Sequence, residues 1–161
     1  MINLRTGLLL AVMYYFLSDP SESSSKRTKT KCLLLSCMDY RFIQSTAELL
    51  ERLEYEKAYD YFVLAGASLG YNAGPEDWRT TWLDHIVLAK RLHQIQEIVI
   101  VEHEDCGYYK QFYGVQNDNF QMHLLNVRDF VPEMQALHPD LKFSAYLVTL
   151  SGQTVPLLKM D

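Results

Sequence analysis

Two short stretches of the sequence carry side chains that bind metal ions. Cys37 lies two residues after the apolar run 32–35, and His103 and Cys106 follow the apolar run 98–101. Two thiolates and one imidazole can hold a zinc ion while leaving its fourth position free. An open position is typical of catalytic zinc, whereas structural zinc has four protein ligands. The sequence therefore predicts a catalytic zinc site made by Cys37, His103 and Cys106.

A carboxylate and a guanidinium follow the first of these ligands. Asp39 and Arg41 lie in the same stretch, Cys-Met-Asp-Tyr-Arg, as Cys37. An ordinary surface ion pair would contribute only about 0–1 kcal/mol to stability. Beside a zinc thiolate the pair gains a specific use, because the planar guanidinium binds a carboxylate through two parallel hydrogen bonds. We expect Asp39 either to take the fourth zinc position or to be held away from it by Arg41.

Other chemistries fit the same residues less well. A phosphatase-like thiolate loop needs five residues between Cys and Arg, but only Met, Asp and Tyr separate Cys37 from Arg41. A dinucleotide-binding fingerprint needs GxGxxG after a strand, and the glycines at 66, 70 and 74 are spaced at four. A nucleophilic dyad of Cys37 and His103 remains an alternative. That dyad leaves Cys106 without a role.

The elements that must position these residues alternate along the chain. Short apolar runs predict strands, and apolar residues at three- and four-residue steps predict helices. The expected strands are 32–35, 61–65, 97–101 and 143–150, and the expected helices are 45–53, 76–94 and 119–137. Alternating strands and helices predict an α/β fold with a mostly parallel sheet and flanking helices. Ligands bind beyond the carboxyl ends of such strands, which is where both metal-binding stretches lie.

Bulk properties limit the class of protein. The chain has 161 residues, 48% of them hydrophobic, and a net charge of −5. This length fits one domain with a sizeable core, and the charge gives no basic patch for nucleic acid. Three cysteines do not form a paired disulfide framework. We expect an N-terminal helix and linker over residues 1–30 and a zinc-binding α/β domain over residues 31–161.

The N-terminal segment allows two interpretations. Residues 7–17 are an apolar run, too short to span a bilayer and similar to the core of a signal peptide. No small-residue cleavage pattern follows it, and its apolar positions repeat at helical spacing. We expect a retained helix that docks on its own domain or on a partner subunit, in a cytoplasmic protein without a membrane span. Export is the alternative if residues 1–20 are a signal peptide.

The combined motifs resemble those of the β-class carbonic anhydrases. Cys-x-Asp-x-Arg at 37–41 and His-x-x-Cys-Gly at 103–107 carry the resemblance, which extends over residues 31–150. It implies that Cys37, His103 and Cys106 bind zinc and that Asp39 and Arg41 form a catalytic dyad. It also implies parallel core strands with an antiparallel edge, and a homodimer or a larger assembly of dimers.

The activity implied by this resemblance is carbonic anhydrase activity, that of a carbonate dehydratase and lyase. Hydroxide on zinc would attack carbon dioxide and form bicarbonate, with the Asp39–Arg41 dyad controlling the fourth zinc position. The chain departs from the family pattern at Glu102, where Gly is usual, and at 64–67, where the family has Arg-Asn-Ala-Gly. A hydrolase of carbon disulfide or carbonyl sulfide therefore remains an alternative. A non-catalytic zinc-binding dimer module is another.

Overall fold

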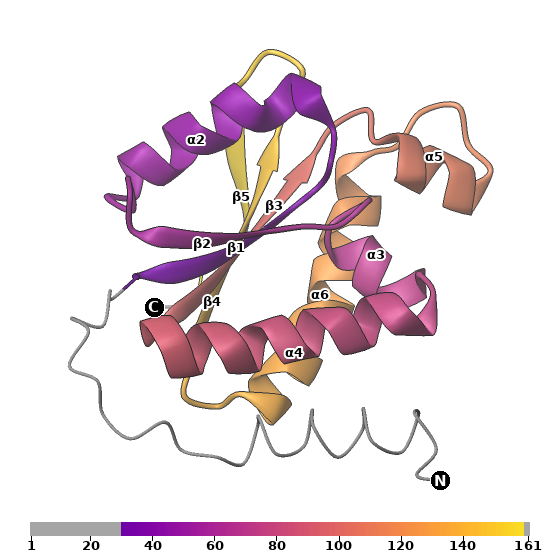
Figure 1. Cartoon of the computed structure of the whole chain (residues 1–161). Helices are drawn as coiled ribbons and strands as arrows, with labels where there is room; N and C mark the ends of the chain where they lie inside the picture. The colour runs from indigo at the N-terminus through magenta and orange to yellow at the C-terminus, as the bar shows by residue number, and fades with distance from the viewer. Residues whose placement is uncertain (1–29, 160–161) are drawn as a thin grey trace, which may run out of the picture.

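A five-stranded sheet forms the centre of the protein. The computed structural model describes residues 30–159, and the strand order is β2-β1-β3-β4-β5. The first four strands run parallel and β5 pairs antiparallel with β4 (Figure 1). The bounds are Cys32–Ser36 for β1, Tyr59–Val63 for β2, Glu97–His103 for β3, Lys142–Val148 for β4 and Thr154–Lys159 for β5.

Helices cover both faces of this sheet. In Figure 1, α2 lies over one face, and α3, α4 and α6 lie over the other. The remaining helices are the short η1, which leads from β1 into α2, and α5, which follows β3. The bounds are Tyr40–Phe42 for η1, Ile43–Arg52 for α2, Ser68–Ala73 for α3, Glu76–His93 for α4, Gly107–Tyr113 for α5 and Phe120–Leu137 for α6.

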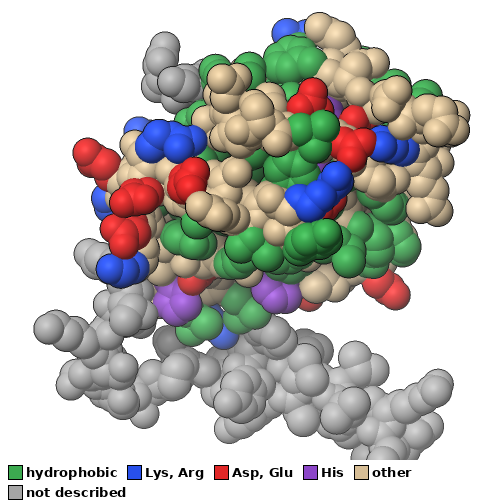
Figure 2. Space-filling view, turned by 90° about the horizontal axis from the view of Figure 1, so that it is seen from above, with side chains coloured by type: hydrophobic (Ala, Val, Ile, Leu, Met, Phe, Trp, Pro, Cys, Tyr) green, Lys and Arg blue, Asp and Glu red, His purple; other side chains and the backbone are tan. Residues whose placement is uncertain are grey.

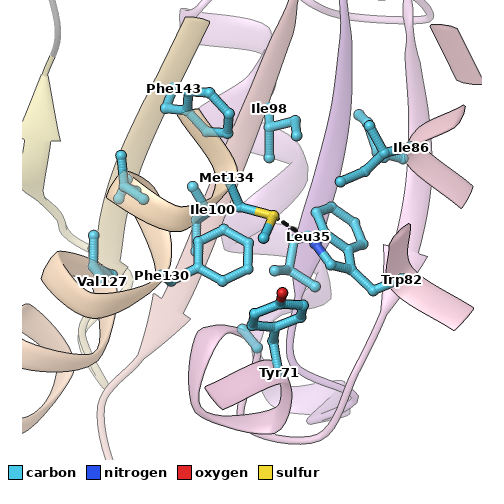
Figure 3. Packing of buried hydrophobic residues seen from close by; sticks show 14 of the residues in the cluster. Leu35, Tyr71, Trp82, Ile86, Ile98, Ile100, Val127, Phe130, Met134 and Phe143 are labelled. Carbon is cyan, nitrogen blue, oxygen red and sulfur yellow. Dashed lines mark hydrogen bonds between the residues drawn. The ribbon is translucent and has the colours of Figure 1, made fainter. Parts of the chain in front are cut away.

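The core has one layer on each face because side chains alternate along a strand. Leu33 and Leu35 of β1 pack with residues of α4 and α6, whereas Leu34 packs with residues of η1 and α2. β1 is buried along its whole length, as expected of a central parallel strand. The larger layer contains the fully buried Trp82 and Phe130 (Figure 3). These two layers fix the strands whose ends carry the metal-binding stretches.

The expected α/β class and the mostly parallel sheet with an antiparallel edge are confirmed. Four elements were not predicted: η1, β5, α3 and α5. β5 contains Pro156, which lacks an N–H donor and is tolerated only on an edge strand such as this one. The helices α3 and α5 have six and seven residues, too few to show a helical repeat in the sequence.

The expected N-terminal helix, the signal peptide alternative and most of the linker lie outside the described residues. The domain boundary near residue 30 therefore stays a prediction. Within residues 30–159, no helix is both long enough and apolar enough to cross a lipid bilayer.

Candidate metal centre

The three predicted ligands meet at the carboxyl ends of two neighbouring strands. β1 and β3 pair in parallel with Ser36 opposite Val101, so both chains leave the sheet at the same edge. The ligand atoms of Cys37, His103 and Cys106 all lie within 4.8 Å of one another. The two sulfur atoms are 4.0 Å apart. This separation suits two thiolates that share one tetrahedral ion, because each Zn–S bond is about 2.3 Å long.

The imidazole of His103 is held with one nitrogen ready to bind. His103 is the last residue of β3, and its ring stacks on that of Phe42 with centroids 4.3 Å apart. Nδ1 donates to the backbone oxygen of Glu104 over 2.9 Å, since a carbonyl oxygen only accepts. Nε2 is buried and has no hydrogen-bond partner among the described residues. A buried nitrogen without a partner is costly, and a metal ion would satisfy it.

Contact between the two thiols shifts their pKa values in opposite directions. The hydrogen-bond contact with Cys106 lowers the pKa of Cys37 well below that of a free thiol, although burial opposes the shift. His103 and the backbone N–H of Gly66, 3.3 Å from the Cys37 sulfur, also favour the thiolate. The same thiol–thiolate contact raises the pKa of Cys106. Burial lowers the pKa of His103, but contact with the Cys37 thiolate outweighs burial and raises it. Thiolate sulfur and imidazole nitrogen are the donors that zinc prefers.

A lowered thiol pKa predicts how Cys37 reacts in the metal-free protein. Because the thiolate already dominates near neutral pH, we expect its rate of alkylation by iodoacetamide to change less than about twofold between pH 6.5 and 8. An ordinary thiol would react roughly tenfold faster for each pH unit below its pKa. Mass spectrometry of the Cys37 peptide measures the rate. Cys32 is the internal control, because burial raises its pKa to about 12. A tenfold rise per pH unit at Cys37 would contradict the assigned thiolate.

Asp39 and Arg41 form the expected pair beside the ligands. Arg41 Nε donates to Asp39 Oδ1 over 3.0 Å, and Nη2 donates to Oδ2 over 2.7 Å. The backbone N–H of Arg41 also donates to Oδ1. These bonds to Arg41 hold the pKa of Asp39 below its usual value, so the carboxylate stays ionised. Asp39 is engaged by Arg41 and is not part of the Cys37, His103 and Cys106 group.

Asp105 connects this pair to the second metal-binding stretch, a link that the sequence did not predict. Arg41 Nη1 donates to Asp105 Oδ2 over 2.8 Å, and Nη2 donates to the Asp105 backbone oxygen over 3.1 Å. Lys110 pairs with the other carboxylate oxygen. Hydrogen bonds from Lys110 and Arg41 lower the pKa of Asp105 to about 2. Arg41 is therefore fixed from two sides, which limits the positions that Asp39 can take.

A small cavity lies against the candidate ligands. Its volume is about 10 Å³, room for roughly one water molecule. Asp39 and two of the candidate ligands, Cys37 and His103, line it together with apolar residues. The lining residues are Ser36, Cys37, Asp39, Phe42, Ile43, Thr46, Tyr61, Val101 and His103.

Three further side chains are buried around the site, and the sequence did not predict that they meet. Glu102, Asp118 and His123 form one hydrogen-bonded chain behind the ligands. The spacing of His123 gave no link to the site, because its contacts depend on how α6 packs. The one signal present in the sequence was Glu102, at a position where the β-class pattern has Gly.

Comparison with known proteins agrees with this geometry. A family model described as "Putative carbonic anhydrase" matches residues 27–153. An uncharacterized protein of Rickettsia conorii is 34% identical over a match that covers 81% of this chain and 76% of the relative. An uncharacterized protein of Rickettsia bellii is 32% identical, with 81% and 86% covered.

Solved structures share the fold. The carbonic anhydrase from Streptococcus mutans superposes with a TM-score of 0.56 at 16% identity, covering 98% of this chain and 99% of its own. The β-carbonic anhydrase isoform I of Trichomonas vaginalis gives 0.56 at 15% identity, covering 97% and 96%. At this low sequence identity, the similarity to the two solved structures shows only the fold. Membership of the family is shown by the match to the family model. The chain belongs to the "Putative carbonic anhydrase" family and has the fold of the β-carbonic anhydrases.

Proposed function

We propose that the protein catalyses the zinc-dependent, reversible hydration of carbon dioxide to bicarbonate. The observation that carries the proposal is the convergence of Cys37, Cys106 and the unpartnered Nε2 of His103 beside a carboxylate that Arg41 holds. A permanently closed zinc site would gain little from an arginine that competes for a potential fourth ligand. The family membership supports the same reaction.

Cys37, His103 and Cys106 would hold the zinc ion, and two of them, Cys37 and His103, also line the cavity. Zinc supplies a Lewis acid that lowers the pKa of a bound water, so that a hydroxide nucleophile forms near neutral pH. Two thiolates neutralise the +2 charge of the ion. This donor set should therefore lower the pKa of a bound water less than three neutral histidines would. The residues around the site must then help to activate the water.

Asp39 would orient the nucleophile. An ionised carboxylate has about four acceptor positions. Three N–H groups of Arg41 donate to Asp39, namely the backbone N–H, Nη2 and an Nε that reaches both oxygens, which leaves about one position. A remaining lone pair can accept a hydrogen bond from the attacking water and thereby aim the oxygen lone pair at the substrate carbon. Arg41 would keep Asp39 in this orientation because Asp105 fixes the guanidinium from the other side. Orientation of this kind lowers the barrier by removing the need to align the reactants.

The cavity would select a small, weakly polar substrate. Phe42, Ile43 and Val101 are apolar residues of its lining. Its volume of about 10 Å³ holds roughly one water molecule, so even a triatomic substrate enters only when the lining residues move. Carbon dioxide is linear and uncharged, so apolar walls do not oppose its entry. Carbonyl sulfide and carbon disulfide share this shape, and the experiment must separate them.

Stopped-flow hydration assays between pH 6.5 and 9 test the proposal. The pKa of Asp39 is lowered by its bonds to Arg41, so Asp39 is ionised throughout this range. A rise in rate then does not come from ionisation of Asp39, and the proposal assigns it to loss of a proton by the nucleophilic water. We expect kcat to rise roughly tenfold per pH unit below the pKa of that water. A flat profile would contradict the proposed nucleophile.

The same sample can be offered carbonyl sulfide and carbon disulfide, with release of sulfide as the signal. Faster turnover of either sulfur compound would overturn the choice of substrate while retaining the metal centre. Bound zinc without turnover of any of the three would support the non-catalytic module instead.

We also propose that the active form is a homodimer or a larger assembly of dimers. β2 is an edge strand, so one side of its backbone has no strand partner among the described residues. Hydrophobic side chains lie exposed among charged groups on the side that carries α2 (Figure 2). The exposed apolar residues on β2 and around η1 are Met38, Tyr40, Ile43, Tyr61 and Val63. An unpaired edge flanked by such residues is a surface that a second copy could cover.

A charge placed on this edge should weaken the assembly. Val63 is 45% exposed, and a lysine there would keep the strand but be desolvated on association. We expect Val63→Lys to raise the dissociation constant by about 30-fold or more, as for loss of a central interface contact. Light scattering over a concentration series measures the mass. Val87→Lys is the matched control, since Val87 is 51% exposed on α4. Equal masses for wild type and Val63→Lys at every concentration would count against this interface.

A further inference from the structure

A buried charged chain lies behind the metal centre, outside the ligand set. The side chains of Glu102 and His123 are each 1% exposed, and that of Asp118 is 2% exposed. His123 Nδ1 lies 3.2 Å from Glu102 Oε2, and Nε2 lies 2.9 Å from Asp118 Oδ2. Burial lowers the pKa of His123, but the bonds to both carboxylates outweigh burial and raise it. Each ring nitrogen of His123 thus faces a carboxylate oxygen, an arrangement that suits an imidazolium between two carboxylates.

Both ends of this chain reach the ligand-bearing segments. Glu102 directly precedes His103 in β3, and its Oε1 accepts a hydrogen bond from the backbone N–H of Ser68 over 3.0 Å. At the other end, Asp118 Oδ1 accepts from the backbone N–H of Asp105 over 2.9 Å. Asp118 Oδ2 accepts from the backbone N–H of Cys106 over 2.8 Å. One carboxylate thus binds two successive amides of the turn that carries a ligand.

The turn needs support of this kind. Asp105 has a φ of +61°, a left-handed conformation that residues with a side chain adopt infrequently. This conformation redirects the chain after β3, so that the sulfur of Cys106 lies 4.0 Å from that of Cys37. The two amides freed by the turn point to one side, where Asp118 receives both. Without an acceptor there, the turn would lose the bonds that compensate its strain.

The ring of His123 is fixed by packing as well as by charge. It lies against the ring of Tyr109, with centroids 4.0 Å apart and an angle of 36° between planes. Tyr109 belongs to α5, the helix that begins directly after Cys106, and it is fully buried. The His123 ring therefore cannot rotate away from Asp118 without disturbing α5. This contact couples α6 to the turn that carries Cys106.

We propose that Glu102, His123 and Asp118 act as positioning residues that hold the 104–106 turn and thereby place Cys106 for metal binding. Asp118 accepts two backbone hydrogen bonds from the turn. His123 orients the Asp118 carboxylate and balances its charge, and Glu102 orients His123. The inference rests on the proposed metal centre. It goes beyond that centre because none of the three residues belongs to the candidate ligand group or lines the cavity.

The test uses Asp118→Asn in the full-length protein. Asparagine keeps the shape and one carbonyl oxygen, and its amide can donate to a neutral His123, so the buried chain remains paired. One amide of the turn loses its acceptor. Hydrogen exchange of the 103–107 peptide in the metal-free protein should therefore become at least about tenfold faster. Zinc affinity, measured by competition with a chelator, should fall roughly 10- to 100-fold. The absorption spectrum of the Co²⁺-loaded variant should also shift, because the sulfur geometry changes.

Two further variants complete the test. Glu102→Gln keeps the bond to Ser68 and should produce the same changes on a smaller scale, which provides a second measurement if Asp118→Asn does not fold. Glu97→Gln is the matched control, because Glu97 begins the same strand and its carboxylate accepts from Tyr55 and Ser144 at the opposite end of the sheet. We expect this control to bind zinc within about twofold of wild type.

The outcomes separate this inference from the proposed function. Wild-type exchange and wild-type zinc affinity in both Asp118→Asn and Glu102→Gln would overturn the positioning role. An equal loss of affinity in Glu97→Gln would also overturn it, because the effect would then reflect general instability. A wild-type protein that binds no zinc would contradict the proposed metal centre. In that case faster hydrogen exchange of the 103–107 peptide in Asp118→Asn would still support the role of Asp118 in stabilising the turn.

Discussion

Replacement of Cys37 by serine is expected to remove both the metal and the activity. A serine hydroxyl is neutral at pH 7 and is a weak ligand compared with a thiolate, so only one imidazole and one thiol remain. We expect zinc to fall from about one ion per chain to near zero. Carbon dioxide hydration should fall to the rate in buffer alone. Metal analysis and stopped-flow assays on the same sample measure both.

The Cys37→Ser chain should still fold, because the core lies elsewhere. Both hydrophobic layers of the sheet form without Cys37, which is only partly buried in a small cluster near the turn. Cys32→Ala is the matched control, since Cys32 is a fully buried thiol at the other end of β1. This control should lose some stability through the cavity that it creates but keep its zinc. Retention of zinc by Cys37→Ser would contradict the assigned ligand set.

Replacement of Asp39 by asparagine is expected to separate binding from catalysis. The amide keeps the size of the carboxylate. It has only one acceptor oxygen, however, and lacks the negative charge that pairs with Arg41. Zinc should remain, because Asp39 is not part of the ligand group. We expect kcat to fall roughly 100- to 1,000-fold, the usual effect of losing one pre-oriented polar group. Stopped-flow assays with matched zinc content measure this.

The control for Asp39→Asn is Asp140→Asn. Asp140 also pairs with a cation, Lys90 at 2.7 Å, but its side chain is 60% exposed. We expect this change to leave kcat within about twofold of wild type, because exposed ion pairs contribute little. Loss of zinc from Asp39→Asn would make Asp39 a metal ligand. An unchanged kcat with full zinc would remove Asp39 from the mechanism.

The sequence predicted the four parallel strands but not β5, because the core is organised around the parallel ones. Continuous apolar runs at 32–35 and 98–101 marked the central parallel strands. Since parallel strands end at a common edge, the positions of Cys37, His103 and Cys106 after these runs were enough to bring them together. The pairing of Asp39 with Arg41 could be predicted for a similar reason, because two residues on one turn need no long-range packing to meet.

The parts that could not be predicted depend on contacts between distant segments. The bridge from Arg41 to Asp105 joins turns after two different strands. The buried Glu102, His123 and Asp118 chain requires α6 to pack beside the end of β3, which no local pattern encodes. From the sequence, Glu102 stood out only because it replaces the usual Gly. Its burial, which requires a paired partner, is seen only in the structure.

The most direct test of the account is a zinc titration of the metal-free protein, with carbon dioxide hydration measured on each sample. We predict that activity will rise in proportion to bound zinc and stop rising at about one ion per chain. Binding should also displace protons, since thiols and an imidazole must lose theirs to bind the ion. Zinc that binds at this ratio without any gain in hydration rate would contradict the proposed enzyme, as would hydration that does not depend on zinc.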